Sequence, residues 1–311
     1  MSQPLVTIVL CTYNRAEMLR GALASLARLD TGADLSCELV VIDNNSTDAT
    51  AQVVEDLTPE FSYPVRRIFE AQPGVVFARN RGVTEARGEW IAFFDDDELA
   101  DPQWLRQLLE MAQEKQARCV GGAVYLLLPE GIQRNLSPVS RMLLGETVGM
   151  DTPRKFDHRT TPTCGNLLIH RSVFDEIGLF DPAYNRRGED TDLFLRIYHA
   201  KIEAWFTPAA FTQHVTPPNR LTDEYLQKMS ETMIRGMAEQ ERNACGRWAY
   251  PVIWLARVGQ AALVLFPRWL SAKVAGDHDR VLGAACRLKI AGGYLRDGWN
   301  LICGMPPKYA A

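Results

Sequence analysis

The sequence lacks the features that mark a secreted, disulfide-stabilised or repetitive protein. Its 311 residues contain seven cysteines, an odd number, and no two of them form a C-x-x-C pair. Several lie within apolar runs, as Cys11 does, which is typical of reduced, buried thiols and favours a cytoplasmic protein. The N-terminus has no basic segment followed by a long apolar stretch, so no secretion is expected. Internal repeats and low-complexity tracts are also absent.

Positive charge is scarce in the first three quarters of the chain. Residues 1–239 hold 24 Lys and Arg against 34 Asp and Glu, whereas residues 240–311 hold 10 against 4. The overall net charge of −4 argues against a protein that binds nucleic acid. The asymmetry predicts an acidic catalytic body and a basic tail suited to an anionic surface.

The first 128 residues alternate between strand and helix patterns. Apolar runs predict strands at residues 5–11, 39–42, 65–69, 90–94 and 120–128. Helical spacing predicts helices at residues 16–29, 49–57 and 76–86, with another that starts at Asp101. This alternation predicts an α/β fold with a doubly wound, mostly parallel sheet.

The second half of the chain is less regular. Residues 129–162 are punctuated by proline and glycine, which predicts loops and short helices over the site. Strands are expected at residues 167–170, 204–206 and 210–215, and helices at 171–177 and 190–200. Everything after about residue 221 has a helical pattern, so we predict a domain boundary there.

Three consecutive aspartates, Asp95, Asp96 and Asp97, follow the apolar run at residues 90–94. In open α/β sheets, ligands bind beyond the carboxyl ends of the strands. Neighbouring carboxylates repel one another unless a cation shares the site, and hard oxygen ligands select Mg²⁺ or Mn²⁺, which often also hold a phosphate. The alternative interpretation is a solvated acidic turn.

Two further polar clusters follow predicted strands, at residues 12–15 and 43–48. An acidic residue that follows an early strand of such a sheet commonly binds the ribose or base of a nucleotide. Asp43, which follows the second predicted strand, is therefore a candidate nucleotide contact. Its alternative role is to cap the next helix. Arg79 is placed either to pair with the end of the third strand or to reach a phosphate.

Together these stretches resemble the family 2 inverting glycosyltransferases of GT-A fold. The resemblance covers about residues 4–220 and rests on residues 6–15, 41–48, 74–82, 93–98, 164–170, 180–181 and 188–193. Each segment is weak alone, whereas their order and spacing are specific. The resemblance implies a Rossmann-like catalytic domain over residues 1–220, with a nucleotide-sugar half (1–128) and an acceptor half (129–220). A helical C-terminal region would follow at 221–311.

The resemblance also implies a reaction: transfer of a sugar from a nucleotide-sugar, with a UDP-sugar as the expected donor, to a glycan or lipid-linked acceptor. The implied setting is cell-surface polysaccharide or glycolipid biosynthesis. Asp97 would bind Mn²⁺ or Mg²⁺, and His214 would add a metal or phosphate contact unless it is only a hydrogen-bonded residue at a strand end. Gly165 and Asn166 would contact the acceptor. The implied nucleotide-sugar contacts are Thr12, Tyr13, Asn14, Arg15, Asp43, Arg79, Asp95 and Asp96.

The pair Glu189-Asp190 opens a predicted helix and matches the catalytic position of the family. Inversion needs a carboxylate that accepts the acceptor hydroxyl's proton, so Asp190 is the predicted base and Glu189 its acceptor-orienting neighbour. We expect the helix N-terminus to lower the pKa of Asp190. The alternative is that both residues only cap the helix. Processive members carry Gln-x-x-Arg-Trp, and here Ala244 replaces that glutamine, which predicts single addition.

Residues 252–266 are an apolar stretch between Pro251 and Pro267. Fifteen helical residues span roughly 22 Å, less than a hydrocarbon core of about 30 Å, which favours a helix lying at the membrane interface. We therefore predict peripheral contact through residues 249–303 with the inner face of the cell membrane. A helical cap on the catalytic domain or on a second subunit of a homodimer is the alternative.

Two other function classes fit the pattern less well. A nucleotidyltransferase on a similar sheet would carry a glycine-rich loop with Lys or Arg after the first strand, but residues 11–15 contain no glycine. A non-catalytic binding protein is disfavoured because both Asp97 and Asp190 are present.

Overall fold

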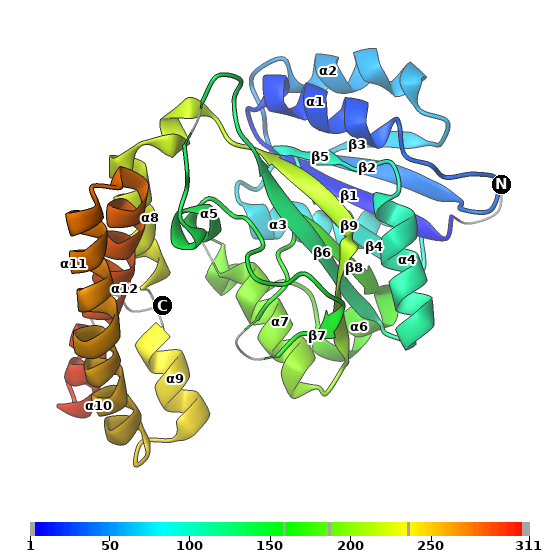
Figure 1. The fold of residues 1–311 in the computed structure, drawn as a ribbon. Helices are drawn as coiled ribbons and strands as arrows, with labels where there is room; N and C mark the ends of the chain where they lie inside the picture. The colour runs from blue at the N-terminus through cyan, green and yellow to red at the C-terminus, as the bar shows by residue number, and fades with distance from the viewer. Residues whose placement is uncertain (1–3, 133, 158–159, 186–187, 235–236, 307–311) are drawn as a thin grey trace. The chain divides into compact units, whose positions relative to one another are not determined.

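A computed structural model describes residues 4–306 except residues 133, 158–159, 186–187 and 235–236. The chain forms two compact units (Figure 1). The sheet unit consists of Met1–Leu127 and Gly149–Val215, and the helical unit of Leu128–Val148 and Thr216–Ala311. Residues 128–148 therefore pack with the C-terminal helices, although the sequence analysis assigned 129–148 to the acceptor half.

The described residues of the sheet unit form a nine-stranded sheet in the order β3-β2-β1-β4-β8-β6-β9-β5, with β7 paired to β9. The strands are β1 (Val6–Thr12), β2 (Cys37–Asp43), β3 (Val65–Phe69), β4 (Trp90–Asp95), β5 (Glu98–Ala100), β6 (Cys119–Leu127), β7 (Arg154–Lys155), β8 (Asn166–His170) and β9 (Ala204–Val215). Strands β1 to β4 pair in parallel, and β8 pairs antiparallel to both β4 and β6. The predicted α/β class with a mostly parallel sheet is confirmed.

Helices cover both faces of this sheet (Figure 1). Side chains alternate along each strand, so Ile8 faces a core shared with α1, α2 and α4, whereas Val9 faces a core shared with α3, α6 and α7. At Gly82 of α3 an added Cβ would lie 2.2 Å from Val9, so only glycine allows this close approach. The helices are α1 (Ala16–Leu26), α2 (Thr50–Leu57), η1 (Thr58–Glu60), α3 (Val75–Glu85), α4 (Trp104–Lys115), α6 (Arg171–Ile177), η2 (Pro182–Tyr184) and α7 (Glu189–His199).

Strand β9 corrects one expectation from the sequence. Residues 204–206 and 210–215 were expected as two strands, but Ala204–Val215 is one strand parallel to β6. The register shifts between Gly122 and Ala123, opposite a segment of β9 that contains Pro208. Proline is tolerated at such bulges because no ladder N–H is needed there. Because the strand is continuous and runs parallel to β6, His214 lies near its carboxyl end.

The helical unit contains α5 (Pro138–Leu143), η3 (Pro218–Leu221), α8 (Asp223–Met233), α9 (Met237–Cys245), α10 (Tyr250–Gln260), η4 (Ala261–Leu265), α11 (Phe266–Ala275) and α12 (His278–Ile302). Arg134 forms ion pairs with Asp279 and Asp223, which tie the segment before α5 to α12 and α8. The Trp254 indole N–H donates to the Leu295 carbonyl at 2.8 Å, which joins α10 to α12.

The helix that contains the apolar stretch near the C-terminus is longer than the predicted segment 252–266 between Pro251 and Pro267. Helices α10, η4 and α11 form one helix over Tyr250–Ala275, 26 residues and roughly 39 Å long. Pro267 lacks an N–H and its ring crowds the carbonyl of Leu263, and the helix continues because Ala261–Leu265 widen into a π-helical segment. By length and composition, this is the one helix among the described residues that could cross a membrane, which alone is weak evidence.

Candidate active site

Polar residues gather where β1, β2 and β4 end at the same edge of the sheet. In the parallel register Thr12 lies opposite Asp43, and Cys11 lies opposite Asp95. The aspartate run therefore begins beside the end of β1 and one strand away from the end of β2, at the edge where open α/β sheets bind ligands.

Asp96 holds the first loop to the aspartate run. The Thr12 hydroxyl donates to Asp96 Oδ2 at 2.7 Å, and Arg15 Nη1 donates to Asp96 Oδ1 at 2.7 Å. Burial raises the pKa of Asp96 to about 6, against the opposing effect of Arg15. Both carboxylate oxygens are thus bonded within the protein, so Asp96 fixes Thr12 and Arg15, and its contact with the donor stays a prediction.

Asp97, in the turn between β4 and β5, meets His214 of β9, which is far from it in sequence. His214 Nε2 lies 3.4 Å from Asp97 Oδ2, and Arg15 Nη1 lies 3.2 Å from the same oxygen. The Val215 N–H also donates to the Asp97 carbonyl at 2.8 Å, which anchors the end of β9 here. These two side chains are the pair that the resemblance implied as metal ligands.

The donor set at Asp97 fits a cation that arrives with phosphates. Among the described residues, no group of three His, Cys, Asp or Glu side chains forms a metal cage. Mg²⁺ commonly uses one or two carboxylates together with substrate phosphates and waters, so a carboxylate with an adjacent imidazole meets that requirement. The surrounding carboxylates add negative charge that a cation would offset.

Arg79 does not pair with the end of the third strand, and its contact with a phosphate stays a prediction. Its guanidinium approaches Asp95 Oδ1 at 3.5 Å and Glu189 Oε1 at 2.6 Å, and so bridges the aspartate run and α7. The end of the third strand is served by Arg67, whose Nη1 lies 3.0 Å from Asp43 Oδ2. Burial raises the pKa of Asp95 although Arg79 lowers it.

Asp190 stands in the first turn of α7, after Gly188 in a left-handed conformation at φ 89°. Its Oδ1 accepts the Thr191 N–H at 2.7 Å. The expected lowering of its pKa by the helix N-terminus is wrong. Burial and the charge of Glu189 raise the pKa of Asp190, and they outweigh Arg79 and the backbone hydrogen bond. A carboxylate in this state is a stronger base than an exposed aspartate.

Glu98 is a site residue that the sequence analysis missed. It is buried in β5, opposite His214 in the register with β9. Burial and the charge of Asp95 raise its pKa well above the ordinary value. A Cβ at Gly165 would lie 2.3 Å from Glu98 Oε1 and 2.8 Å from Asp95 Oδ2, so glycine is required beside these carboxylates. Its position directly after the aspartate run was the available signal.

Asn166, expected as an acceptor contact, is instead part of the sheet interior. Its side chain is fully buried and donates to the carbonyls of Ala123 and Ala210 at 2.9 and 3.0 Å. The Trp104 indole N–H donates to its amide oxygen at 2.8 Å. With these three bonds the amide group joins β6, β8, β9 and α4, and it is not available to an acceptor.

The predicted nucleotide contacts of the first two loops divide into two kinds. Asn14 Oδ1 accepts the Thr47 N–H at 2.7 Å, and Asp43 Oδ1 accepts the Ser46 N–H at 2.9 Å, so both side chains shape the loops. Tyr13 is 56% exposed at the same edge and is free to stack on a planar ligand.

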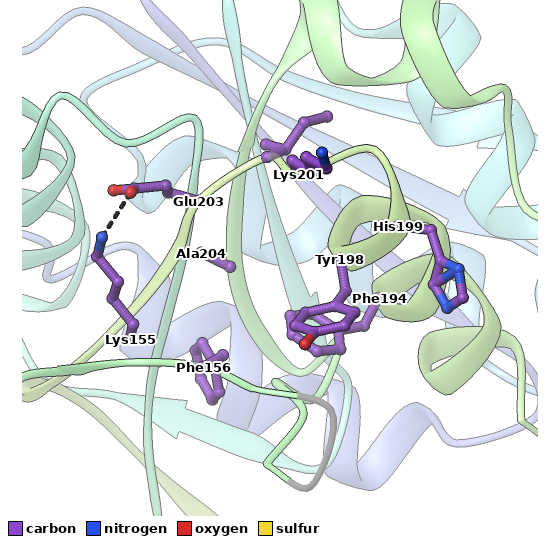
Figure 2. A pocket seen from close by; sticks show the side chains of 9 residues that line it. Lys155, Phe156, Phe194, Tyr198, His199, Lys201, Glu203 and Ala204 are labelled. Atoms are coloured by element: carbon purple, nitrogen blue, oxygen red, sulfur yellow. Dashed lines mark hydrogen bonds and ion pairs between the residues drawn. The ribbon is translucent and has the colours of Figure 1, made fainter. Parts of the chain in front are cut away.

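A pocket of the sheet unit lies away from these carboxylates. It has a volume of about 440 Å³ and is lined by residues such as Lys155, Tyr198 and Ala204 (Figure 2). Ala204 begins β9, whereas His214 lies ten residues further along, on the order of 30 Å in an extended strand. This pocket therefore takes no part in the chemistry at Asp97.

The chain is similar to known glycosyltransferases. Residues 7–178 match the family model described as glycosyl transferase family 2. The succinoglycan biosynthesis protein ExoM of Rhizobium meliloti (strain 1021) is 28% identical over 252 residues, which cover 78% of each chain. The uncharacterized glycosyltransferase EpsJ of Bacillus subtilis (strain 168) is 24% identical over 246 residues, covering 74% of this chain and 69% of the relative.

Solved structures share the fold. The mannosyltransferase PcManGT from Pyrobaculum calidifontis, in complex with GDP-Man and Mn²⁺, matches with a TM-score of 0.61 and 17% identity, over 96% of this chain and 88% of that chain. S. aureus TarS 1–349 in complex with UDP-GlcNAc matches with a TM-score of 0.53 and 16% identity, over 96% and 92% of the two chains. At these identities the likeness shows the fold alone.

Proposed function

Because the chain belongs to glycosyl transferase family 2 and has the GT-A fold, we propose that it transfers one sugar, with inversion, from a nucleotide-diphosphate sugar to a glycan or lipid-linked acceptor. That it is a glycosyltransferase follows from its family. The donor class, the inversion and the single addition are the proposed parts.

The observation that carries the proposal is the Arg79 bridge. One buried guanidinium contacts Asp95, in the run that would hold the donor, and Glu189, beside the predicted base. This contact fixes the spacing between the two groups that an in-line displacement requires. A helix-capping role alone for Glu189 and Asp190 would not need such a buried connection.

In the proposed reaction Asp190 accepts the proton of the acceptor hydroxyl as that oxygen attacks the anomeric carbon. Glu189 is held by Arg79, which leaves Asp190 as the carboxylate of the pair that faces the acceptor. Asp97 and His214 would hold Mn²⁺ or Mg²⁺. When bound, such an ion supplies positive charge that stabilises the departing nucleoside diphosphate.

The setting proposed for the reaction is the cytoplasmic face of the cell membrane. The name of ExoM refers to synthesis of a polysaccharide, and we propose a similar role in cell-surface polysaccharide or glycolipid synthesis for this chain. The neighbours bound to GDP-Man and UDP-GlcNAc support a nucleotide-sugar donor, and a UDP-sugar is the first to test.

A thermal-shift panel tests the donor and the metal together. UDP, GDP and TDP and their sugars are added to the full chain, with and without Mn²⁺. A true donor at 100 times its dissociation constant adds about 2.7 kcal/mol of apparent stability, and this gain should need the metal. Asp97→Asn should lose the metal-dependent shift.

The matched control is Asp101→Asn, which removes a carboxylate close in sequence whose Oδ1 accepts the Gln103 N–H at 2.8 Å just before α4. It should keep the full shift. An equal, metal-independent shift in the wild type and in Asp97→Asn would contradict the assignment. Release of pyrophosphate from a nucleoside triphosphate and a sugar phosphate would instead favour a nucleotidyltransferase.

A further inference from the structure

The helical unit contains a basic pocket that the proposed reaction does not use. It has a volume of about 370 Å³ and is formed by residues of α5, η4, α11 and α12. Guanidinium and hydroxyl donors line it, and none of its described lining residues is acidic. Its donors are Ser137, Arg268, Ser271, Arg280 and Arg287.

Two of the three arginines in this basic pocket keep an uncompensated charge. Arg280 Nε lies 3.0 Å from Asp277 Oδ2, so its charge is partly offset. The other nearby carboxylate, Asp279, is paired with Arg134. Among the described residues, Arg268 and Arg287 have no carboxylate within 4.0 Å. Arginine donors in a concave site match the oxygens of a phosphate group.

The wall of the basic pocket depends on a glycine. A Cβ at Gly283 would lie 1.9 Å from Ser137 Oγ, so α12 can approach the start of α5 only because residue 283 has no side chain. The Ser137 hydroxyl is hydrogen-bonded to Ser140 Oγ at 2.9 Å and caps α5. This side of the pocket is therefore defined by close packing.

A row of apolar side chains lies exposed on the same helix that supplies Arg268. Leu263, Phe266, Leu270 and Val274 are 79%, 51%, 50% and 84% exposed. They are three or four residues apart, so they share one side of the helix. Lys273 Nζ lies 4.3 Å from the centre of the Trp269 ring. An aromatic ring next to a basic group is suited to the headgroup level of a membrane.

We propose that the basic pocket binds the phosphate of an anionic membrane lipid while this apolar row enters the acyl-chain boundary. The inference rests on the proposed location at the membrane and is independent of the transfer reaction. A second copy of the chain fits less well, because residues 240–311 hold 10 basic against 4 acidic residues and a symmetric pairing would bring like charges together.

Vesicle flotation of the full chain tests the proposal. Phosphatidylcholine vesicles are compared with vesicles that also contain phosphatidylglycerol. The wild type should bind the anionic vesicles more tightly, and Arg268→Gln/Arg287→Gln should bind them about thirtyfold more weakly, since each arginine near such a surface contributes roughly 1 kcal/mol. Leu263→Asn/Leu270→Asn should weaken binding to both kinds of vesicle.

The matched control is Arg20→Gln/Arg28→Gln, which removes two exposed charges from the sheet unit. If it weakens binding as much as the pocket variant does, net charge and not the pocket is responsible, and the proposal fails. It also fails if the wild type floats with neither kind of vesicle or forms a dimer that does not float. Glycerol 1-phosphate should not displace the protein, and displacement at low concentration would assign the pocket to a soluble phosphate.

The donor thermal shift on the same variants separates this inference from the proposed function. The pocket variant should keep its nucleotide-sugar shift. Loss of vesicle binding with donor binding retained supports the pocket, whereas vesicle binding without any donor shift in the wild type overturns only the transfer reaction.

Discussion

The two units of the chain distribute charge and apolar surface in opposite ways. In the sheet unit most large apolar side chains are inside, and the carboxylates of Asp96, Asp97 and Glu98 are buried at one edge of the sheet. In the helical unit, apolar side chains such as Leu263 and Val274 are exposed, and arginines line a pocket. Burying a charge and exposing a large apolar surface both cost free energy. The buried carboxylates of one unit and the exposed apolar side chains of the other therefore each indicate a ligand. One unit is suited to reaction chemistry and the other to a surface.

The largest expected effect tests the chemistry of the sheet unit. Asp190→Asn keeps the shape of the side chain but cannot accept the acceptor's proton, so transfer should fall by about a thousandfold or more. Donor binding in the thermal-shift assay and flotation with anionic vesicles should both persist. Near-normal transfer by this variant would contradict the proposal that Asp190 is the base.

The next effect tests whether buried charge in the sheet unit depends on Arg79. Arg79→Met leaves Asp95 and Glu189 without their partner, which should lower the free energy of unfolding by about 3 kcal/mol or more at neutral pH. The control Arg81→Met breaks the pair with Glu85, whose arginine is 44% exposed, and should cost less than about 1 kcal/mol. Urea unfolding measures both, and equal losses would contradict the bridge.

A smaller effect tests the packing of the helical unit. A Cβ at Gly298 would lie 2.5 Å from Trp254 Cδ1 and 2.5 Å from the Tyr250 hydroxyl, so Gly298→Ala should destabilise the α10–α12 contact by about 1–3 kcal/mol. Gly292, on the same helix, has open space around it, so Gly292→Ala should stabilise by about 0.5–1 kcal/mol. Calorimetry of the full chain should show a lower melting temperature for Gly298→Ala and a higher one for Gly292→Ala. A shift of the same sign for both variants would contradict the close packing at Gly298.

Local pattern was sufficient for the parts of the site that depend on strand ends. Thr12, Asp43 and Asp95 meet because β1, β2 and β4 are parallel, and alternating apolar runs predict that arrangement. It was insufficient where contacts join residues that are 43 to 110 positions apart. The bond from Arg79 to Glu189 spans 110 residues, and the buried role of Asn166 depends on three segments that are distant in sequence.

Two elements that the sequence analysis predicted too short contain a proline. Pro208 lies in a strand and Pro267 in a helix, each at a place where the missing N–H is absorbed by an irregularity of the backbone. A bulge or a π-helical segment depends on the packing around it, and the local sequence does not encode that packing.

The smallest effect concerns the pH dependence of the base. Burial raises the pKa of Asp190, and the charge of Glu189 raises it further. Transfer should therefore fall as the pH drops through a value above the ordinary aspartate range. Glu189→Gln removes that charge and releases Arg79 to favour the ionised form of Asp190, so the acidic limb of kcat/KM should move to lower pH by roughly half a unit to one unit.

The control for this shift is Asp192→Asn, which removes a carboxylate from the same turn of α7 where its Oδ2 pairs with Arg196 at 2.9 Å. In Asp192→Asn the acidic limb of kcat/KM should stay at the wild-type pH. An equal shift in both variants would mean that net charge alone sets the pKa of Asp190. Stability runs in the opposite direction. A raised folded-state pKa gives a contribution that is complete below the unfolded pKa and is lost as the pH rises through the folded value. The sheet unit should thus become less stable over the same pH range in which Asp190 becomes ionised and able to accept a proton.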